Sequence, residues 1–187
     1  MDTYTLVRLL HVAFAIAWLG GGLCLVVLAA RASRANDSGD LVRIIQQVAY
    51  MEGRVFVPSA LLTFVFGAIM AWMADLFGQL WVIIGLAGFL NSLGSGLAVL
   101  KPRTQRVIAL IAKDGATPDA VGQAREIVRI AQFELVVMFA VVADMVIKPA
   151  QDDYLVLLIM ALAIVIAGIV FLRPVVASAA ARRARAA

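Results

Sequence analysis

Five uninterrupted apolar runs, each long enough to cross a lipid bilayer as a helix, dominate this sequence. The hydrocarbon core of a bilayer is about 30 Å thick, and a helix of about 20 residues crosses it. We place the runs at residues 4–30, 55–74, 80–100, 130–148 and 154–172. Only helices and closed barrels satisfy their backbone hydrogen bonds inside lipid. Because the runs are continuous rather than alternating, the sequence predicts an all-α, polytopic transmembrane helical bundle with five spans, in one domain over residues 1–187.

The composition excludes several other classes of protein. Hydrophobic residues make up 64% of the chain and charged residues 15%, against about 45–50% and about 25% in soluble domains. Soluble, disordered and nucleic-acid-binding proteins are therefore excluded, and no nucleic-acid partner is expected. The single cysteine, Cys24, excludes a disulfide within the chain, and the single histidine, His11, excludes a metal site with several histidines.

Basic residues flank the spans unevenly. Fourteen of the sixteen follow the first span, separate the third from the fourth, or follow the fifth, and only Arg8 and Lys148 belong to the other side. Loops rich in Lys and Arg stay on the cytoplasmic side of a membrane. We therefore expect the N-terminus outside and the C-terminus inside a bacterial inner membrane, with the basic segments against anionic lipids of the inner leaflet.

The segments between the spans are also predicted to be partly helical. In residues 40–52 the apolar positions share one helical face, which suits a helix lying on the inner surface or one docked on the neighbouring spans. Residues 101–129 are expected to begin as a helical extension of the third span, which is then interrupted. The fourth helix is expected to begin at Thr117 and Pro118, because Thr117 suits the N-cap and Pro118 the first helical position. Residues 177–187 are expected to form a frayed helix or a disordered tail.

Ionisable side chains inside a membrane are costly, so each is a candidate for function. Arg8 and His11 lie in the outer third of the first span, and Asp144 and Lys148 in the outer third of the fourth. We expect one polar layer from these residues, in which Asp144 pairs with Arg8 or Lys148 and holds the two spans together. Glu134 lies nearer the inner end of the fourth span, where it would reach the interface, pair with a basic group or transfer protons.

A second interpretation of the same layer is a haem site. A neutral histidine that faces the interior of a bundle is a normal axial ligand of haem iron, which makes His11 a candidate metal ligand. Arg8 would pair with a propionate, and Trp18 would offer a flat apolar surface to the ring. Met138 and Met145 each carry a sulfur that would serve as a second ligand.

Short motifs between residues 4 and 149 resemble a known superfamily. They resemble the first, second and penultimate helices of HemJ-type protoporphyrinogen oxidases and of the wider copper-resistance-D-like membrane superfamily. In that order, the motifs are Leu10–Val12 with Ala17–Gly21, Glu52–Arg54 with Pro58–Ala60, and Met145–Pro149. An uncharacterised family of predicted integral membrane proteins has a similar Met-x-x-Lys-Pro ending.

The resemblance implies a bundle of four or five helices and, for the enzymes, haem bound through a histidine of the first helix, which is His11 here. One position departs from the enzymes, which carry a lysine after the tryptophan that opens the third span. Here Trp81 is followed by Val82, Ile83 and Ile84, with no basic residue. This departure argues against oxidase activity and leaves haem binding as the implied property.

Three classes of function follow from these residues. The first is a small inner-membrane protein that binds haem b through His11 and serves redox or haem-related chemistry. The second is a non-enzymatic membrane subunit or scaffold, in a homo-oligomer or with a partner subunit, whose polar layer is structural. The third is transport of protons or a small solute by Asp144 and Glu134, although the sequence shows no repeat of broken helices.

Overall fold

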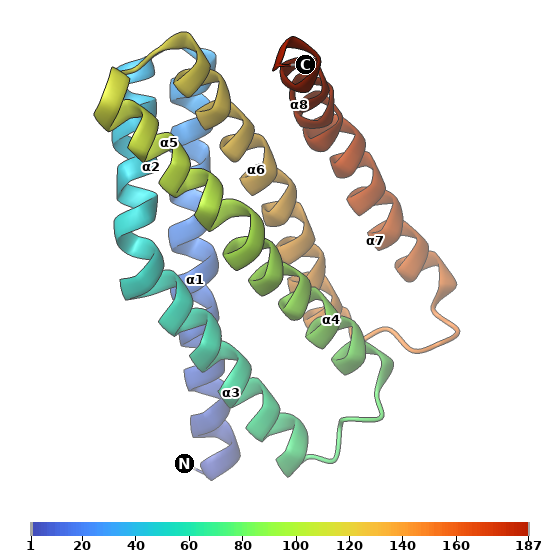
Figure 1. Cartoon of the computed structure of the whole chain (residues 1–187). Coiled ribbons are helices and arrows are strands. Elements are labelled where there is room, and N and C mark those ends of the chain that lie inside the picture. Colours follow the sequence, from blue (N-terminus) through green and yellow to red (C-terminus); the bar gives the residue numbers. More distant parts are fainter. Residues whose placement is uncertain (1, 187) are drawn as a thin grey trace.

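A computed structural model describes residues 2–186, except for the side chains of residues 181–183, 185 and 186. Within these residues every regular element is a helix, which confirms the all-α prediction. The elements shown in Figure 1 are α1 (Thr3–Arg34), α2 (Ser38–Met51), η1 (Glu52–Phe56), α3 (Val57–Met73), α4 (Leu80–Ser95), η2 (Gly96–Leu100), α5 (Lys101–Asp114), α6 (Pro118–Ile147), α7 (Tyr154–Ala167), η3 (Gly168–Leu172) and α8 (Arg173–Ala186). They join into five rods that are long and apolar enough to cross a membrane.

Three of the five rods contain a π-helical segment, and each segment has the same cause in the sequence. A proline follows two residues after η1, η2 and η3, at Pro58, Pro102 and Pro174. Proline has no N–H, and its ring clashes with the carbonyl four residues earlier, which here lies inside the π-helical segment. The backbone widens in response: the Val57 N–H donates to the Glu52 carbonyl, and the Lys101 N–H donates to the Gly96 carbonyl.

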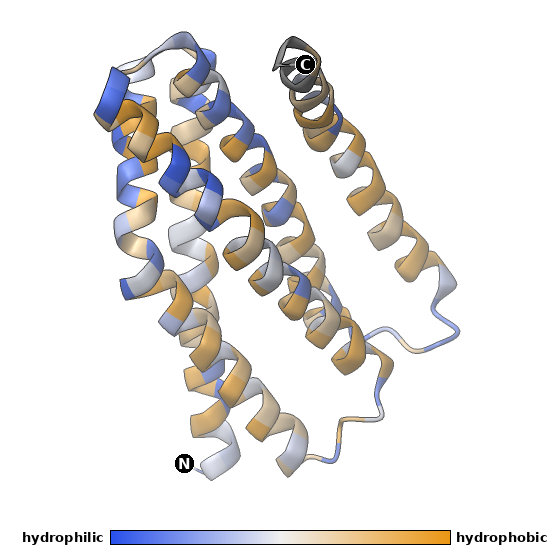
Figure 2. Ribbon diagram, viewed as in Figure 1, coloured by the Kyte–Doolittle hydropathy of each residue, from blue (hydrophilic) through white to orange (hydrophobic). Residues whose placement is uncertain are grey.

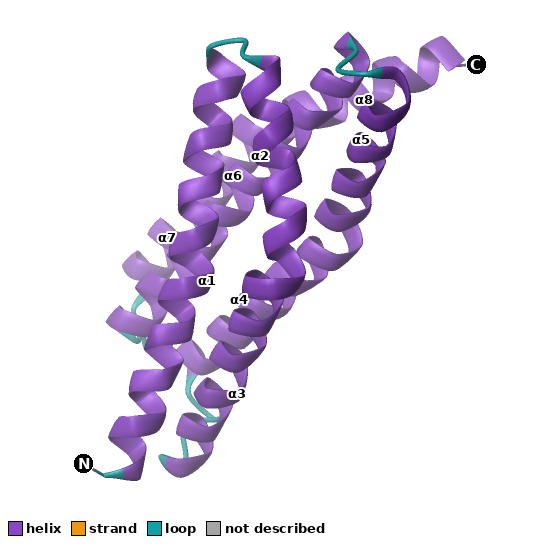
Figure 3. Cartoon of the chain, turned by 90° about the vertical axis from the view of Figure 1, so that its left-hand side faces the viewer, coloured by secondary structure: helices purple, strands orange, loops and turns teal. Residues whose placement is uncertain are grey.

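The spans pack in two close pairs, α1 with α3 and α4 with α6, whereas α3 and α4 barely touch. Small residues allow the helices of each pair to approach closely. This is expected in a membrane, because the hydrophobic effect does not drive helices together in lipid and close packing does. A side chain added at Gly67 on α3 would meet the His11 ring at 2.9 Å. One added at Gly88 on α4 would overlap Val141 on α6. α7 packs on α6 at the side of the bundle (Figures 1 and 3).

A cluster of buried apolar side chains lies at the end of the bundle where α1 stops and α6 begins, which we call the basic end. Its members come from α1, α2, α5 and α6: Ala29, Ala32, Leu41, Ile45, Val107, Ala124, Ile127 and Val128. Polar residues surround this end, and apolar residues cover the other half (Figure 2). Nearly all of residues 40–52 belong to α2. Leu41 and Ile45 of α2 are buried in this cluster. This is the docked arrangement, not a helix lying on the surface.

A polar cluster fastens α5 and α8 to α6 at the same end. The buried Glu126 accepts a hydrogen bond from the Ser178 hydroxyl at 2.6 Å, and its other carboxylate oxygen lies 3.9 Å from a guanidinium nitrogen of Arg103. The residues expected to form a frayed or disordered tail lie in α8 as far as Ala186, and residue 187 lies outside the description.

The ends of α6 follow the signals in the sequence. The Thr117 hydroxyl accepts a hydrogen bond from the Ala120 N–H at 3.3 Å, and Pro118 is the first helical residue. At the other end Lys148 takes a left-handed conformation with φ of 54°, directly before Pro149. The fourth helix therefore begins where predicted and ends one residue before the predicted position.

Gly88 tests the close packing of α4 on α6. Alanine is a better helix former than glycine by about 1 kcal/mol, but at Gly88 its Cβ would overlap the stiff, branched side chain of Val141. We expect Gly88→Ala to lower the free energy of unfolding in detergent by about 1–3 kcal/mol. Gly94→Ala is the control, because nothing lies within 4 Å of the added Cβ, and it should leave stability unchanged or higher. Equal effects of the two variants would contradict the described pairing.

Candidate functional site: a cavity between two helix pairs

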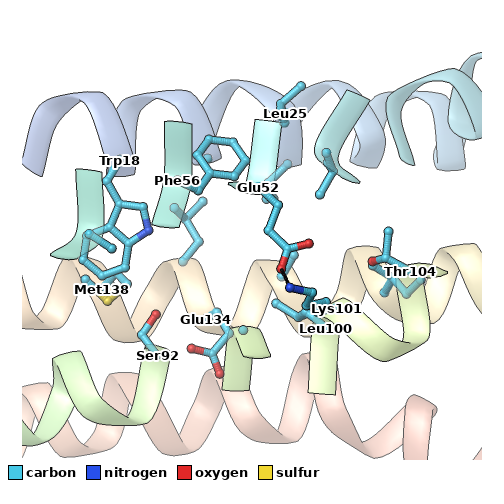
Figure 4. Close-up of a pocket in the computed structure, with 18 of the residues that line it drawn as sticks. Trp18, Leu25, Glu52, Phe56, Ser92, Leu100, Lys101, Thr104, Glu134 and Met138 are labelled. Atoms are coloured by element: carbon cyan, nitrogen blue, oxygen red, sulfur yellow. Dashed lines mark ion pairs between the residues drawn. The ribbon is translucent and has the colours of Figure 1, made fainter. Parts of the chain in front are cut away.

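A cavity of about 220 Å³ lies between the α1–α3 and α4–α6 pairs, toward the basic end. Its wall is mostly apolar, and Figure 4 shows its main residues. Two π-helical segments provide residues to the wall of this cavity. Glu52 and Phe56 come from η1, and Gly96 and Leu100 come from η2. Because π-helical segments inside α-helices frequently occur at functional sites, the coincidence of two of them with one cavity makes this the leading candidate site.

An ion pair joins the two π-helical regions across the cavity. The Lys101 Nζ lies 3.9 Å from the Glu52 Oε1, and Figure 4 marks this contact. The two side chains are 44% and 21% exposed, so water screens the pair only in part. This pair was not predicted from the sequence.

Glu134 of α6 brings an acid into the wall of the cavity, where Ser92 of α4 also lies (Figure 4). Ser95 lies within hydrogen-bonding reach of the Glu134 carboxyl. The Oε2 atom, however, is buried and has no hydrogen-bond partner among the described residues. An ionised carboxylate without a partner is costly in such surroundings. The free oxygen therefore marks a place for a proton, a cation or a hydrogen-bond donor.

Asp144 lies ten residues further along α6, about 15 Å away by the rise of a helix. Its side chain is fully buried, and within the described chain neither carboxylate oxygen has a hydrogen-bond partner. It faces α4, since a Cβ added at Gly85 would lie 3.7 Å from its Oδ2. α6 thus carries two acids that each have a buried carboxylate oxygen without a hydrogen-bond partner among the described residues, Glu134 in the cavity wall and Asp144 between helices.

The expected ion pair of Asp144 with Arg8 or Lys148 is absent from the described part of the chain. Side chains four residues apart, such as those of Asp144 and Lys148, lie side by side only when both residues are part of a helix. α6 ends before Lys148, so these two side chains are not brought together. The Lys148 ammonium lies instead over the ring of Trp81, 5.1 Å from its centroid. Arg8 is exposed. The predicted polar layer is therefore not held together by the ion pair proposed for it.

Three aromatic rings, which we call the aromatic layer, lie between the levels of the two acids. Phe89 of α4 packs edge-on against Trp18 at 5.8 Å and stacks on Phe64 at 5.0 Å between ring centroids. Phe89 lies four residues after Gly85, which faces Asp144, and six before Ser95, which lies beside Glu134. The aromatic layer therefore separates Asp144 from the acid in the cavity.

His11 packs on α3 rather than in the cavity. Its Nδ1 lies 2.7 Å from the Thr63 carbonyl oxygen. A carbonyl only accepts hydrogen bonds, so Nδ1 carries the proton, and Nε2 of the neutral ring has a free lone pair. The ring is half-buried and rests against Gly67. The contact with the Thr63 carbonyl thus favours the tautomer of His11 that carries its proton on Nδ1.

The residues proposed to hold haem do not share one pocket. Trp18 and Met138 line the cavity, whereas Met145 packs against Gly85 of α4. His11 and Arg8 are not among the lining residues. Among the described residues, no three or more His, Cys, Asp or Glu side chains gather as a metal site.

A comparison with protein families identifies the chain. The model of the family described as "Predicted integral membrane protein (DUF2269)" matches residues 5–149. The chain belongs to this family. It is therefore a multi-pass integral membrane protein, in agreement with the five apolar rods. No curated protein and no solved structure matches it.

The ion pair across the cavity gives a prediction for this family member. A double-mutant cycle with Glu52→Gln and Lys101→Met should give a coupling free energy of about 1 kcal/mol, because the pair is partly shielded from water. The control pair, Arg43 with Asp40, is closer at 3.5 Å, but its side chains are 80% and 59% exposed. Its coupling should be at most about 0.3 kcal/mol. Unfolding in detergent measures both, and a larger coupling in the control pair would contradict the prediction.

Proposed function

We propose that this protein moves protons across the membrane, with Glu134 and Asp144 as the groups that bind them. One observation carries the proposal: α6 has an acid on each side of the aromatic layer, and each acid has a buried carboxylate oxygen without a hydrogen-bond partner among the described residues. Carboxylates at such positions in membrane proteins typically belong to proton relays or ion pathways. Glu126, on the same helix at the basic end, shows the contrast, because Ser178 and Arg103 both interact with it.

The cavity supports the first step, exchange of a proton between water and Glu134. Its volume of about 220 Å³ exceeds the share of about 30 Å³ that one water occupies in the liquid. Several waters would therefore fit, and Glu52, Lys101 and Thr104 supply polar groups in the wall. Water in the cavity would let Glu134 gain and lose its proton from the basic end.

The aromatic layer and the loose contact between α3 and α4 support a gated second step. Asp144 is buried and the aromatic layer lies between it and Glu134, so a proton would pass from one acid to the other when the rings of the aromatic layer move apart. Two of these rings, Phe64 and Phe89, lie on α3 and α4, the two helices that barely touch. The rods that contain α3 and α4 also carry η1 and η2. π-helical segments inside α-helices frequently occur at functional sites.

Proton flux into liposomes tests the proposal. Vesicles with a trapped pH-sensitive dye would hold the full chain, and a potassium diffusion potential would drive protons inward. We expect faster acidification than in empty vesicles, and a rate at least tenfold lower over that background for both Glu134→Gln and Asp144→Asn. Asp40→Asn, which alters an exposed acid of α2, is the matched control and should keep the rate of the unaltered protein.

Two outcomes would refute the proposal. One is a rate for the unaltered protein equal to that of empty vesicles. The other is a rate that survives both Glu134→Gln and Asp144→Asn at equal amounts of reconstituted protein.

We propose in addition that the basic end faces the cytosol of a bacterial cell, with the chain in the inner membrane. The support is the distribution of Lys and Arg, fourteen of sixteen of which flank the spans on that side. A cytosol-dependent reporter fused after residue 187 should be active, and an exported reporter would contradict this orientation.

A second candidate function is haem binding through His11, supported by the hydrogen bond that favours its Nδ1-protonated tautomer. Histidines that ligate metals almost always donate their other N–H to a carbonyl or carboxylate, as His11 does to Thr63. In the tautomer with the proton on Nδ1, Nε2 would be the axial ligand, and Arg8, one turn away on α1, would pair with a propionate. Haem b, when bound, would supply one-electron redox chemistry. Because His11 does not line the cavity, a haem that it held would lie outside that cavity.

An absorption spectrum tests this candidate. If haem is bound through His11, the protein purified in detergent should show a Soret band that is lost in His11→Ala. The band should persist in Met138→Leu, since Met138 lines the cavity while His11 packs on α3. A colourless protein after expression with added haem, or a band that survives His11→Ala, would contradict ligation by His11.

A further inference from the structure

A second hollow lies at the basic end, on the side of α1 that faces away from α3. It is a groove of about 630 Å³ between α1, α6 and η3. α6 forms its floor, because α6 packs against both α1 and η3 while α1 and α7 do not touch (Figure 1). The lining residues are Val26, Val27, Ala30, Arg31, Arg34, Ala35, Gln132, Leu135, Val136 and Phe171.

The groove combines a cationic end with an apolar remainder. Arg31 and Arg34 are three residues apart in the last turn of α1 and so share a face. Both are exposed, and neither forms an ion pair within the described chain. No acidic residue lines the groove among the described residues. Two cationic groups therefore converge on a hollow in which the chain provides no counter-charge.

The depth of these groups matches the structure of a bilayer. α1 has 32 residues and is therefore about 48 Å long, which exceeds the hydrocarbon thickness of about 30 Å. The last turn of α1 then lies at the level of the lipid headgroups. Val27, Val136 and Phe171 extend from there toward the hydrocarbon core.

We propose that this groove binds one anionic phospholipid. The phosphate would accept hydrogen bonds from Arg31 and Arg34, whose planar guanidinium groups suit bidentate contact with phosphate oxygens. The Gln132 amide would donate a further hydrogen bond to the headgroup, and an acyl chain would lie along Val136 and Phe171. Basic pockets between transmembrane helices bind lipid headgroups in this way. The occupant is a lipid rather than a soluble anion, because the charged end and the apolar remainder belong to one continuous groove.

Thermal unfolding of delipidated protein in detergent tests this proposal. Phosphatidylglycerol should raise the melting temperature in a saturable manner, and phosphatidylcholine should not. In Arg31→Gln/Arg34→Gln the apparent affinity for phosphatidylglycerol should fall by at least roughly tenfold. Both side chains are exposed, so the variant should fold and melt normally without lipid. Arg43→Gln, which alters an exposed arginine of α2, is the matched control and should keep the full response.

Three results would overturn the proposal. Equal stabilisation by phosphatidylcholine would show that the acyl chains alone act. An unchanged phosphatidylglycerol response in the double variant, or an equal loss in Arg43→Gln, would show that the charge of the whole basic end acts and not this groove. Stabilisation by inorganic phosphate at matched concentration would show a site for a free anion.

Discussion

The absence of water from the hydrocarbon core determines where this chain places its polar and apolar groups. Inside lipid, burial of apolar side chains gains little, and helices associate through close packing of small residues. The α1–α3 and α4–α6 pairs follow this rule at Gly67 and Gly88. At the basic end the helices extend into water, where the hydrophobic effect favours burial of apolar side chains. Leu41 and Ile45 are accordingly buried in an apolar core there. The same constraint makes a buried carboxylate oxygen without a partner costly, which is why Asp144 and the Oε2 atom of Glu134 stand out among the described residues.

The cavity lies beside two helical segments whose regular hydrogen bonding is interrupted near a proline. Proline is excluded from the regular interior of a helix, yet the rods that contain η1 and η2 each carry one at a comparable depth. The π-helical segments absorb this conflict by shifting a hydrogen bond by one residue, as at Val57 and Lys101. Glu52 lies at the start of η1 and Lys101 directly after η2, and the two side chains meet across the cavity. The two π-helical segments thus also line the site.

Much of the fold could be predicted from the sequence, because lipid leaves few choices to an apolar run of twenty residues. The five spans and the start of α6 at Pro118 follow from such rules. The partners of the charged residues did not follow in the same way. The pairing of Asp144 with Lys148 was wrong because the helix ends between them, although Pro149 marks that end in the sequence. The contact of Glu52 with Lys101 depends on the register between rods, which no local pattern encodes. The π-helical segments could have been expected from Pro58, Pro102 and Pro174, each inside an otherwise continuous helical run.

The position of α6 has a consequence for how the chain assembles during synthesis. α1 and α3 belong to neighbouring rods of the sequence and can associate as soon as both have entered the bilayer. α4 makes little contact with α3 and finds its main partner only in α6. The first three rods are therefore synthesised before α6, the helix on which α4 packs, exists. A truncated chain that stops before Pro118 would lack this helix and would be a natural substrate for membrane proteases.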